Sequence, residues 1–428
     1  AAGNDKIVFL NTSNNIARSD VSLQVSGDDI WVRIDDFASG AFDSIRLVDW
    51  LADGESHRIE SLELFDGSKI STADMIYRID PSNTLGLTIG GANPWINGTN
   101  GDNTVFRGTA SANIIRTFDG NDTIVAGGGD DVIDGGAGYD SINYIEMTGG
   151  VIADLTQGYV KKADGTTDAL YNIESVLDSD YNDTLRGNAA DNKLVSRGGN
   201  DKIYGEDGDD EIVVGEGNDT IDGGSGIDTA KYNFVASGVR ITADLAANTV
   251  TKVVVSSGAT NSTDTITNVE NISGTSETDF IYGDSVGNTL WGLDGNDWLF
   301  GHQGADTLYG GSGNDSYLFL RGDARVDGSV NEADTISDSG GTDRLWIRSN
   351  DVVRTQFSYL LSGSDLLIRI ADPNSTTGAY DEVRVADWLT SEANRLESIE
   401  FLLDGSKIGI ADMIYRIDPS NTLGLTIG

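Results

Sequence analysis

The stretch Thr117 to Asn143 reads TFDGNDTIV-AGGGDDVID-GGAGYDSIN, three nonapeptides that decide the fold of this chain. Glycine occupies one to three of the first four positions of each nonapeptide, an aspartate occupies the sixth position and an isoleucine the eighth. Glycine allows a tight turn with φ > 0, and the residues around the isoleucine are left to form a short strand. The stretch therefore predicts one turn and one strand in every nonapeptide. Its recurring aspartates are Asp122, Asp131 and Asp140.

The same phase returns in two further blocks of the chain. We expect two nonapeptides to complete one coil of about 18 residues, with the apolar residues pointing inward and the strands of successive coils stacked about 4.8 Å apart. Such stacking predicts an all-β, parallel β-roll. The sixth positions hold, in the second block, Asp183, Asn192, Asp201, Asp210, Asp219 and Asp228, and in the third block Asp279, Asn288, Asp297, Asp306 and Asp315.

The repeated aspartates indicate metal binding. In a stack of coils, the aspartate of one turn lies near the turn one coil later, where backbone carbonyls line the edge of the roll. Carboxylate and carbonyl oxygens are hard ligands, and Ca²⁺ takes roughly 6–8 of them. Because calcium alone accounts for the regular spacing of the carboxylates, we expect several Ca²⁺ ions and no catalytic pair among these residues.

The nonapeptide G-G-x-G-x-D-x-U-x, with U a large apolar residue, is a known signature of calcium-binding parallel β-helix repeats, and these blocks resemble the RTX family of bacterial secreted proteins. In that family, sixth-position aspartates and turn carbonyls of two nonapeptides one coil apart bind the metal. The resemblance implies four best-formed sites here, with Asp131 and Asp306 as further sixth-position ligands. The ligands of the four sites are Asp122, Asp140, Gly120, Gly135 and Ala137; Asp201, Asp219, Gly199, Val214 and Glu216; Asp210, Asp228, Gly208, Gly223 and Ser225; and Asp297, Asp315, Gly295, Gly310 and Ser312.

Some turns depart from the family pattern. Asn113, Asn192 and Asn288 stand where an aspartate belongs, and the turns GTSETD and TASAN lack the glycines. An amide brings no negative charge to a cation. We therefore expect these flanking turns to bind calcium weakly or not at all.

The composition excludes several classes of protein. The 69 Asp and Glu against 28 Lys and Arg give a formal net charge of −41 at pH 7, which repels the phosphate backbone of nucleic acid. There is no cysteine and hence no thiol chemistry, and no apolar run of about 18 residues that predicts a membrane span. His57 and His302 are the only histidines, so a zinc site or a Ser-His-Asp set lacks its members. We expect no enzyme activity.

A second, longer repeat spans the chain. Met75 to Gly90 (MIYRIDPSNTLGLTIG) recurs letter for letter at Met413 to Gly428, an offset of 413 − 75 = 338 residues. Upstream of both copies, alternating apolar and polar residues predict strands, followed by a short helix around Ala411 to Tyr415. We expect a β-rich cap domain at both ends of one unit. The chain then belongs to a tandem-repeat array whose partners are neighbouring copies, arranged end to end or as a filament.

The blocks and repeats together predict an all-β chain of parallel β-roll (RTX β-helix) blocks with β-rich inserts and β-rich cap domains. Each insert alternates apolar and polar residues like a hairpin and re-enters the nonapeptide phase through an Asn-(Ile/Val)-Glu step. The predicted boundaries are 1–90 for the cap domain of a preceding unit, 91–116 for a linker and roll entry, 117–143 for roll 1, 144–182 for an insert, 183–231 for roll 2, 232–273 for an insert, 274–320 for roll 3 and 321–428 for the cap domain that repeats 1–90.

Three functional classes stay open from the sequence. The first is an extracellular calcium-binding structural or adhesive protein, such as a segment of a fibre, adhesin or surface layer, that stiffens on binding Ca²⁺ after secretion. The second is the calcium-folding and secretion appendage of a secreted enzyme such as a protease, lipase or polysaccharide epimerase. The third is a module that binds a surface carbohydrate or host-surface ligand. We favour the first because the 338-residue unit recurs, and the resemblance implies export by type I secretion to the medium or the bacterial cell surface.

Overall fold

The structure, a computed structural model, describes residues 6–8, 20–26, 28–36, 41–47, 50–51, 59, 61–64, 69–81, 94–102, 106–326, 332–375, 378–402, 405–420 and 423. The described residues contain two α-helices of eight residues each, α1 (Thr72–Ile79) and α2 (Ile410–Ile417), and are otherwise mainly short strands joined by turns. The prediction of an all-β fold is confirmed. His57 and most of the second half of each MIYRIDPSNTLGLTIG copy lie outside the described residues.

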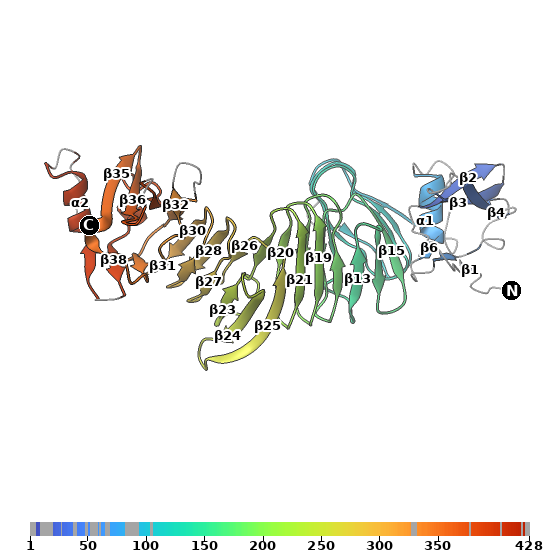
Figure 1. The fold of residues 1–428 in the computed structure, drawn as a ribbon. Helices are drawn as coiled ribbons and strands as arrows, with labels where there is room; N and C mark the ends of the chain where they lie inside the picture. Colours follow the sequence, from blue (N-terminus) through green and yellow to red (C-terminus); the bar gives the residue numbers. More distant parts are fainter. Residues whose placement is uncertain are drawn as a thin grey trace. The chain divides into compact units, whose positions relative to one another are not determined.

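The chain folds as two compact units, Ala1–Asp207 and Gly208–Gly428. In unit 1, the nonapeptide strands stack coil upon coil in two ladders, ladder A and ladder B, that form the two sides of the roll (Figure 1). Ladder A is parallel throughout and consists of β8 (Phe106–Arg107), β10 (Thr123–Val125), β12 (Ser141–Asn143), β16 (Ser175–Leu177) and β18 (Lys193–Val195). Ladder B contains β7 (Trp95–Asn97), β9 (Ile114–Arg116), β11 (Val132–Asp134), β15 (Thr167–Tyr171), β14 (Tyr159–Lys162), β13 (Val151–Asp154), β17 (Thr184–Arg186) and β19 (Lys202–Asp207).

Unit 2 repeats this arrangement with its own two ladders. Ladder A contains β20 (Glu211–Val213), β22 (Thr229–Lys231), β26 (Asn271–Ser273), β28 (Thr289–Asp294), β30 (Thr307–Ser312), β33 (Asp334–Ser337) and β37 (Tyr380–Val385). Ladder B contains β21 (Thr220–Ser225), β25 (Ala259–Thr267), β24 (Thr249–Val254), β23 (Val239–Asp244), β27 (Phe280–Tyr282), β29 (Trp298–Phe300), β31 (Ser316–Phe319), β34 (Arg344–Ile347) and β38 (Ser398–Phe401).

The roll continues beyond residue 320, where the sequence predicts a boundary with the cap domain. β33 pairs in parallel with β30, and β34 pairs in parallel with β31. The connection between these coils is longer, because Asp306 and Asp315 find their counterparts 28 residues later instead of 18. Both ladders keep their parallel pairing across this connection and extend into the predicted cap domain.

Each insert adds one antiparallel strand to ladder B. β14 lies between β15 and β13, and β24 lies between β25 and β23, with antiparallel pairing on both sides. Ladder A passes the inserts without interruption, since β12 pairs directly with β16 and β22 with β26. The alternating pattern of the inserts thus forms a hairpin that stays within the stack of coils.

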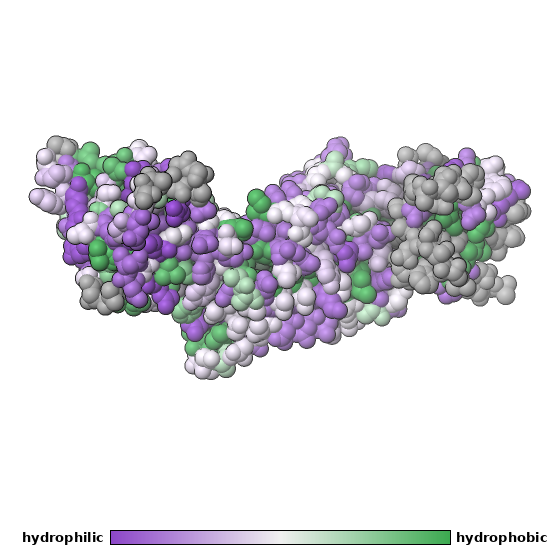
Figure 2. Space-filling view, in the orientation of Figure 1, coloured by the Kyte–Doolittle hydropathy of each residue, from purple (hydrophilic) through white to green (hydrophobic). Residues whose placement is uncertain are grey.

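The core of each roll is a stack of apolar side chains, one from each strand. In ladder A of unit 1, Ile124 lies opposite Ile142, and Ile142 lies opposite Val176, all three with no exposed surface. Figure 2 shows mainly hydrophilic side chains on the visible faces of both units, with only small apolar patches. The eighth-position residues therefore form the core, as their spacing predicts.

The two cap regions match in the order and pairing of their elements. In each, a three-stranded antiparallel sheet is accompanied by a parallel pair, an antiparallel hairpin and a short helix. Trp50 and Trp388, at equivalent positions, are fully buried. The first copy consists of β1 (Lys6–Val8), β2 (Val21–Ser26), β3 (Asp29–Asp36), β4 (Ala41–Leu47), β5 (Ser61–Glu63), β6 (Lys69–Ser71) and α1, and the second of β34, β35 (Phe357–Ser362), β36 (Asp365–Ala371), β37, β38, β39 (Lys407–Gly409) and α2.

The inward stack predicts that neighbouring positions on one strand contribute very differently to stability. Ile203 on β19 is fully buried, whereas Lys202 beside it is exposed. In saturating calcium, we expect Ile203→Ala to lower the free energy of unfolding by about 2–5 kcal/mol and the control Lys202→Ala to change it by less than about 0.5 kcal/mol. Urea unfolding followed by circular dichroism measures both, and similar losses in the two variants would contradict the assignment of the core.

Candidate metal centre

One backbone contact repeats along both edges of the roll. The backbone N–H of a sixth-position aspartate donates a hydrogen bond to the carboxylate of the equivalent aspartate one coil later, which fixes that carboxylate at the turn. The N–H to Oδ1 distances are 2.9 Å from Asp122 to Asp140, 2.8 Å from Asp210 to Asp228 and 2.8 Å from Asp297 to Asp315.

The second oxygen of these carboxylates is buried. Within the described residues, the Oδ2 atoms of several sixth-position aspartates have no hydrogen-bond donor. Burying a carboxylate oxygen without a partner is costly unless a cation compensates for it. The atoms belong to Asp140, Asp228, Asp297, Asp306, Asp315 and Asp343.

Burial also shifts the proton affinity of these groups. Desolvation raises the pKa of Asp297 to about 8, aided by the nearby carboxylates of Asp279 and Asp315, and raises the pKa of Asp306 to about 7. An aspartate whose pKa is raised by folding destabilises the folded state once the pH exceeds its ordinary value, because the unfolded chain ionises more readily. A cation bound to the carboxylates removes this penalty at neutral pH.

Turn glycines make room for a cradle of oxygen atoms. A Cβ atom added at Gly292 would lie 2.4 Å from Asp297 Oδ2 and 2.6 Å from the carbonyl oxygen of Gly310. Carboxylate oxygens and carbonyl oxygens of successive coils thus converge where a side chain cannot fit. This set of hard oxygen donors fits Ca²⁺ and does not resemble the nitrogen or sulfur sites of transition metals.

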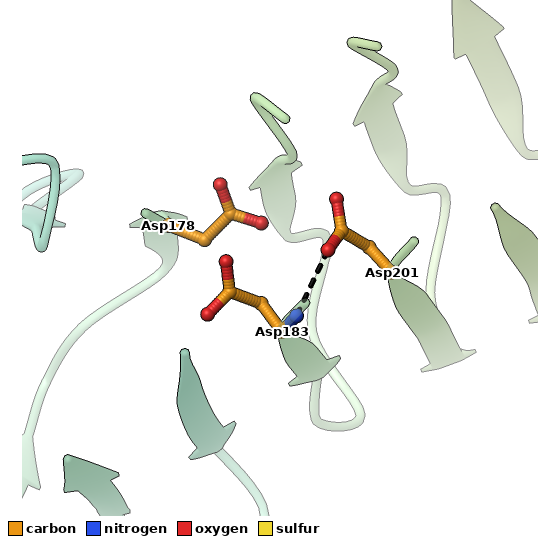
Figure 3. Close-up of side chains that lie close together, drawn as sticks. All are labelled: Asp178, Asp183 and Asp201. Atoms are coloured by element: carbon orange, nitrogen blue, oxygen red, sulfur yellow. Dashed lines mark hydrogen bonds between the residues drawn. The ribbon is translucent and has the colours of Figure 1, made fainter. Parts of the chain in front are cut away.

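Two clusters bring three carboxylates together. Asp178, Asp183 and Asp201 each offer an oxygen within 4.8 Å of the other two, and their side chains converge in Figure 3. Asp178 stands at the first position of its turn, where the sequence pattern expects a carbonyl ligand. The additional carboxylate should strengthen calcium binding at this turn.

The second cluster is formed by Asp315, Asp338 and Asp343, again within 4.8 Å. Only Asp315 is among the ligands that the sequence predicts. The turn Asp338 to Asp343 reads DSGGTD, a weak nonapeptide signal hidden by the longer connection before it. Asp338 again stands at the first position, and it accepts a hydrogen bond of 2.5 Å from the hydroxyl of Tyr317.

The structure brings together three of the four predicted ligand sets. In the first set, Gly120 N–H donates to the carbonyl of Ala137 (2.8 Å), and in the fourth Gly295 N–H donates to the carbonyl of Ser312 (2.9 Å). The remaining set divides between the units, with Gly199 and Asp201 in unit 1 and Val214, Glu216 and Asp219 in unit 2. The three sets that lie within one unit are Asp122, Asp140, Gly120, Gly135 and Ala137; Asp210, Asp228, Gly208, Gly223 and Ser225; and Asp297, Asp315, Gly295, Gly310 and Ser312.

Asp131 and Asp219 differ from the other predicted ligands. The ammonium group of Lys162 lies 3.7 Å from Asp131 Oδ2, and that of Lys252 lies 3.0 Å from Asp219 Oδ2. The structure therefore places an organic cation against two residues to which the sequence analysis assigns calcium. Sequence spacing gives no sign of this, because both lysines come from the inserted hairpins.

The three asparagines at sixth positions satisfy their own polar groups. Asn113 Oδ1 accepts the N–H of Thr109 at 2.7 Å. Asn192 and Asn288 donate from Nδ2 to the carbonyls of Glu174 and Glu270, at 3.2 Å and 2.9 Å. Asn192 and Asn288 thus supply their own donor, and weak metal binding at these turns stays a prediction.

Glutamates take over the sixth position where the inserts rejoin the roll. Glu174 Oε2 accepts the N–H of Asp140, and Glu270 Oε2 accepts the N–H of Asp228, both at 2.8 Å. They belong to the Asn-(Ile/Val)-Glu steps of the sequence. A glutamate therefore makes the contact that an aspartate makes at the other turns.

Glycine at the cradle can be tested with a matched pair. Gly136 (φ +91°) and Gly165 (φ +87°) share the same left-handed conformation, but a Cβ at Gly136 would lie 1.9 Å from the carbonyl oxygen of Phe118, whereas one at Gly165 meets nothing within 4 Å. We expect Gly136→Ala to weaken calcium binding between Asp122 and Asp140 by about 10–100-fold, and Gly165→Ala to leave it unchanged. Calcium titration by calorimetry distinguishes them, and equal affinity in both variants would refute the site.

The comparison with protein-family models agrees with this geometry. The model of the RTX calcium-binding nonapeptide repeat matches four times, at residues 107–142, 177–212, 196–230 and 282–317. No curated protein matches the sequence. Among solved structures, the extracellular lipase LipA from Serratia marcescens is similar at 16% identity and a TM-score of 0.18, over 47% of this chain and 37% of the lipase, so the chain spans little more than a third of that protein. The four matched segments, which contain stacked aspartate turns, are copies of the RTX calcium-binding nonapeptide repeat.

Proposed function

We propose that this chain is a calcium-stiffened structural or adhesive segment of an extracellular protein, and that it forms one period of a tandem array. RTX repeats indicate a secreted, calcium-binding protein. No helix in the described part of the chain combines the length and the apolar character that crossing a bilayer requires. The array requires a defined contact between a cap domain and the roll that follows it, and unit 1 contains such a contact.

Helix α1 of the first cap region packs against the first coils of unit 1. The hydroxyl of Tyr77 donates to Asp134 Oδ2 on β11, and the hydroxyl of Tyr171 on β15 donates to Asp74 Oδ1, both at 2.6 Å. The rings of Tyr77 and Tyr171 lie 4.8 Å apart. These reciprocal hydrogen bonds and the ring contact attach the cap region to the roll.

Helix α2 carries the same residues with a different exposure. Tyr415 and Asp412 correspond to Tyr77 and Asp74 at the offset of 338 residues. Tyr415 is 67% exposed, and the side chain of Asp412 is 34% exposed, against 1% for Asp74. The surface that α1 buries against a roll is therefore displayed by α2. This is the observation that carries the proposal.

A small contact is enough to order such an array. Besides the two hydrogen bonds and the ring pair, the contact contains the ion pair of Lys69 with Asp130 (2.6 Å) and a shared apolar cluster. Covalent linkage in tandem raises the effective concentration of the partner to about the millimolar range. Calcium-bound rolls would then alternate with cap domains along the array. In our proposal the chain leaves the cell by type I secretion, stays unfolded where calcium is scarce, and folds at the outer surface.

The alternative function, a calcium-folding appendage of a secreted enzyme, predicts a different environment for helix α2 of the cap domain. An appendage acts through its rolls during export, and it needs no roll after α2. The two functions are therefore distinguished by whether a following roll covers the surface of Tyr415.

Extending the chain tests the array. Because Gly428 corresponds to Gly90, a second copy of residues 91–428 can be joined after Gly428 in the natural register. We expect hydrogen exchange of the α2 amides to slow by about tenfold or more when a following roll docks on the helix. Tyr415→Ala should reverse the protection, whereas Phe234→Ala, at another exposed aromatic side chain (56% exposed), should not. Identical α2 exchange in the single and the extended chain would favour the appendage.

Removal of calcium tests the stiffening. The chain carries a net charge of −41 and many buried carboxylates, and binding to the folded state alone stabilises that state by mass action. We expect excess chelator to abolish most of the β-sheet signal in far-UV circular dichroism, and added Ca²⁺ to restore it. A fully folded spectrum in excess chelator would contradict the proposed role of calcium.

A further inference from the structure

The two inserts place one buried lysine each at the same point of the fold. The side chains of Lys162 and Lys252 are 1% and 0% exposed. In the first insert Val160 lies opposite Asp168, and in the second Val250 lies opposite Asp264, with the lysine two residues further along the strand in both cases. The antiparallel strands β14 and β24 therefore deliver their lysines in the same register.

The ammonium group of Lys252 is surrounded by four oxygen atoms. Nζ donates to the carbonyls of Gly215 at 2.6 Å and Gly217 at 3.1 Å, and it lies 3.0 Å from Asp219 Oδ2 and 3.0 Å from Asp264 Oδ2. All three charged side chains are fully buried. A single positive charge thus joins two carboxylates and two turn carbonyls.

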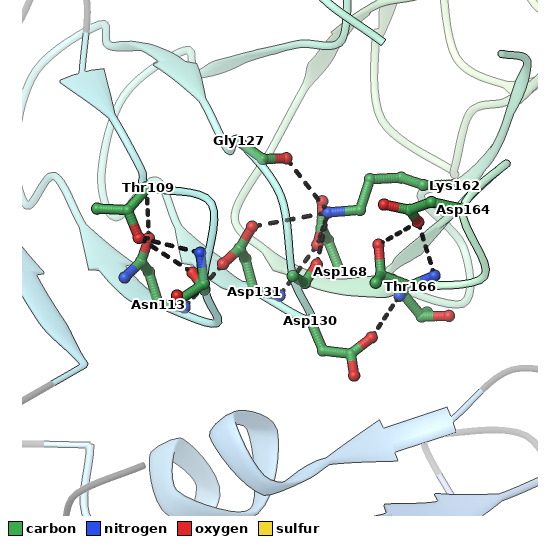
Figure 4. Close-up of polar contacts among 12 residues, drawn as sticks. Thr109, Asn113, Gly127, Asp130, Asp131, Lys162, Asp164, Thr166 and Asp168 are labelled. Carbon is green, nitrogen blue, oxygen red and sulfur yellow. Dashed lines mark hydrogen bonds and ion pairs between the residues drawn. The ribbon is translucent and has the colours of Figure 1, made fainter. Parts of the chain in front are cut away.

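Lys162 makes the equivalent contacts in unit 1 (Figure 4). Its Nζ donates to the carbonyl of Gly129 at 2.7 Å and to Asp168 Oδ1 at 2.6 Å. The carbonyl of Gly127 is 3.5 Å away, and Asp131 Oδ2 is 3.7 Å away. The two networks contain the same set of groups, although the sequences of the inserts differ.

Sixth-position carboxylates and a fourth-position carbonyl, that of Gly129 or Gly217, also belong to the ligand sets of the metal cradles, and the second-position carbonyls of Gly127 and Gly215 are added to them here. Asp131 N–H donates to Asp168 Oδ1 at 3.0 Å, and Asp219 N–H donates to Asp264 Oδ1 at 2.9 Å. These contacts reproduce the bond between sixth-position aspartates of successive coils. Asp168 and Asp264 are therefore the sixth-position residues of the inserted coils, and each ammonium group lies between two such carboxylates.

We propose that Lys162 and Lys252 are built-in cations that replace calcium in these two cradles, so that the coils at the inserts fold without a bound metal ion. An ammonium group offers three donors and can satisfy the carbonyls and carboxylates that a calcium ion would otherwise bind. Its tether makes the positive charge independent of the calcium concentration. In the first insert, the hydroxyl of Tyr144 adds a donor to Asp168 Oδ2 at 2.9 Å.

The arrangement divides the coils into two kinds. Coils whose cradles contain only oxygen atoms require calcium to neutralise their carboxylates, whereas the lysine cradles are neutralised as the hairpin docks. The described part of each unit contains one lysine cradle, on ladder B next to the insert. The inserts are therefore the places where coil structure can persist at low calcium and from which the remaining coils can grow once calcium is available.

Substitution of the lysine should convert its cradle into a calcium site. In Lys252→Ala, two buried carboxylates and two carbonyls are left without their cation. We expect the full-length variant to bind about one further equivalent of calcium per chain, with waters completing its coordination. In chelator, hydrogen exchange of β24 and β25 should accelerate relative to the unsubstituted chain, and calcium should restore the protection. Lys231→Ala is the control, because Lys231 pairs with Glu211 at the surface, and its calcium content should stay unchanged.

Each outcome decides the proposal. A Lys252→Ala chain that gains calcium and is protected only in its presence supports it. A variant that folds but gains no calcium would overturn the proposal, as would one that stays unfolded at β24 and β25 even in saturating calcium, since calcium would then be unable to occupy the place of the ammonium. Lys162→Ala repeats the test in unit 1, with Lys161→Ala as the control on the same strand. Calcium content measured by atomic emission, and exchange measured by mass spectrometry, are read out independently of any adhesive function.

Discussion

The roll depends on a carboxylate that serves two coils at once. One oxygen of Asp140, Asp228 and Asp315 accepts the backbone N–H of the sixth-position aspartate one coil earlier. The other oxygen is left facing the buried edge of the roll. Stacking the coils therefore favours a positive charge at these turns. Turn glycines and converging oxygen atoms lie at the turns where calcium is expected to supply this charge.

The chain compensates for or avoids the negative charge at these turns in more than one way. Calcium is expected where only oxygen atoms converge, as around Asp297 and Asp315. At Asn288 the side chain is itself neutral and supplies a donor. At the inserts, Lys162 and Lys252 bring the charge from a neighbouring strand. The insert hairpins thus contribute to the electrostatic balance of the roll.

The fold was accessible to sequence analysis because its period is fixed by the backbone. A nine-residue spacing predicts the strands, their inward residues and the register. It does not predict the structure of segments that interrupt the period, such as the inserts and the longer connection. Lys162 precedes Asp168 by six residues, but Lys252 precedes Asp264 by twelve, so only the strand pairing reveals that they are equivalent. Likewise, the 28-residue connection to Asp343 hides a coil that the ladders show plainly.

The parallel ladders have a mechanical consequence. Within each unit, the hydrogen bonds between coils run along the axis of the stack, since each strand pairs with the strand one coil before and one coil after it. A tensile load on the axis is then borne by successive coils in series, and the weakest coil yields first. Turns with asparagine, such as that of Asn288, would act as yielding elements, while metal-filled turns hold. Such a chain would lengthen stepwise under load and dissipate energy before it breaks.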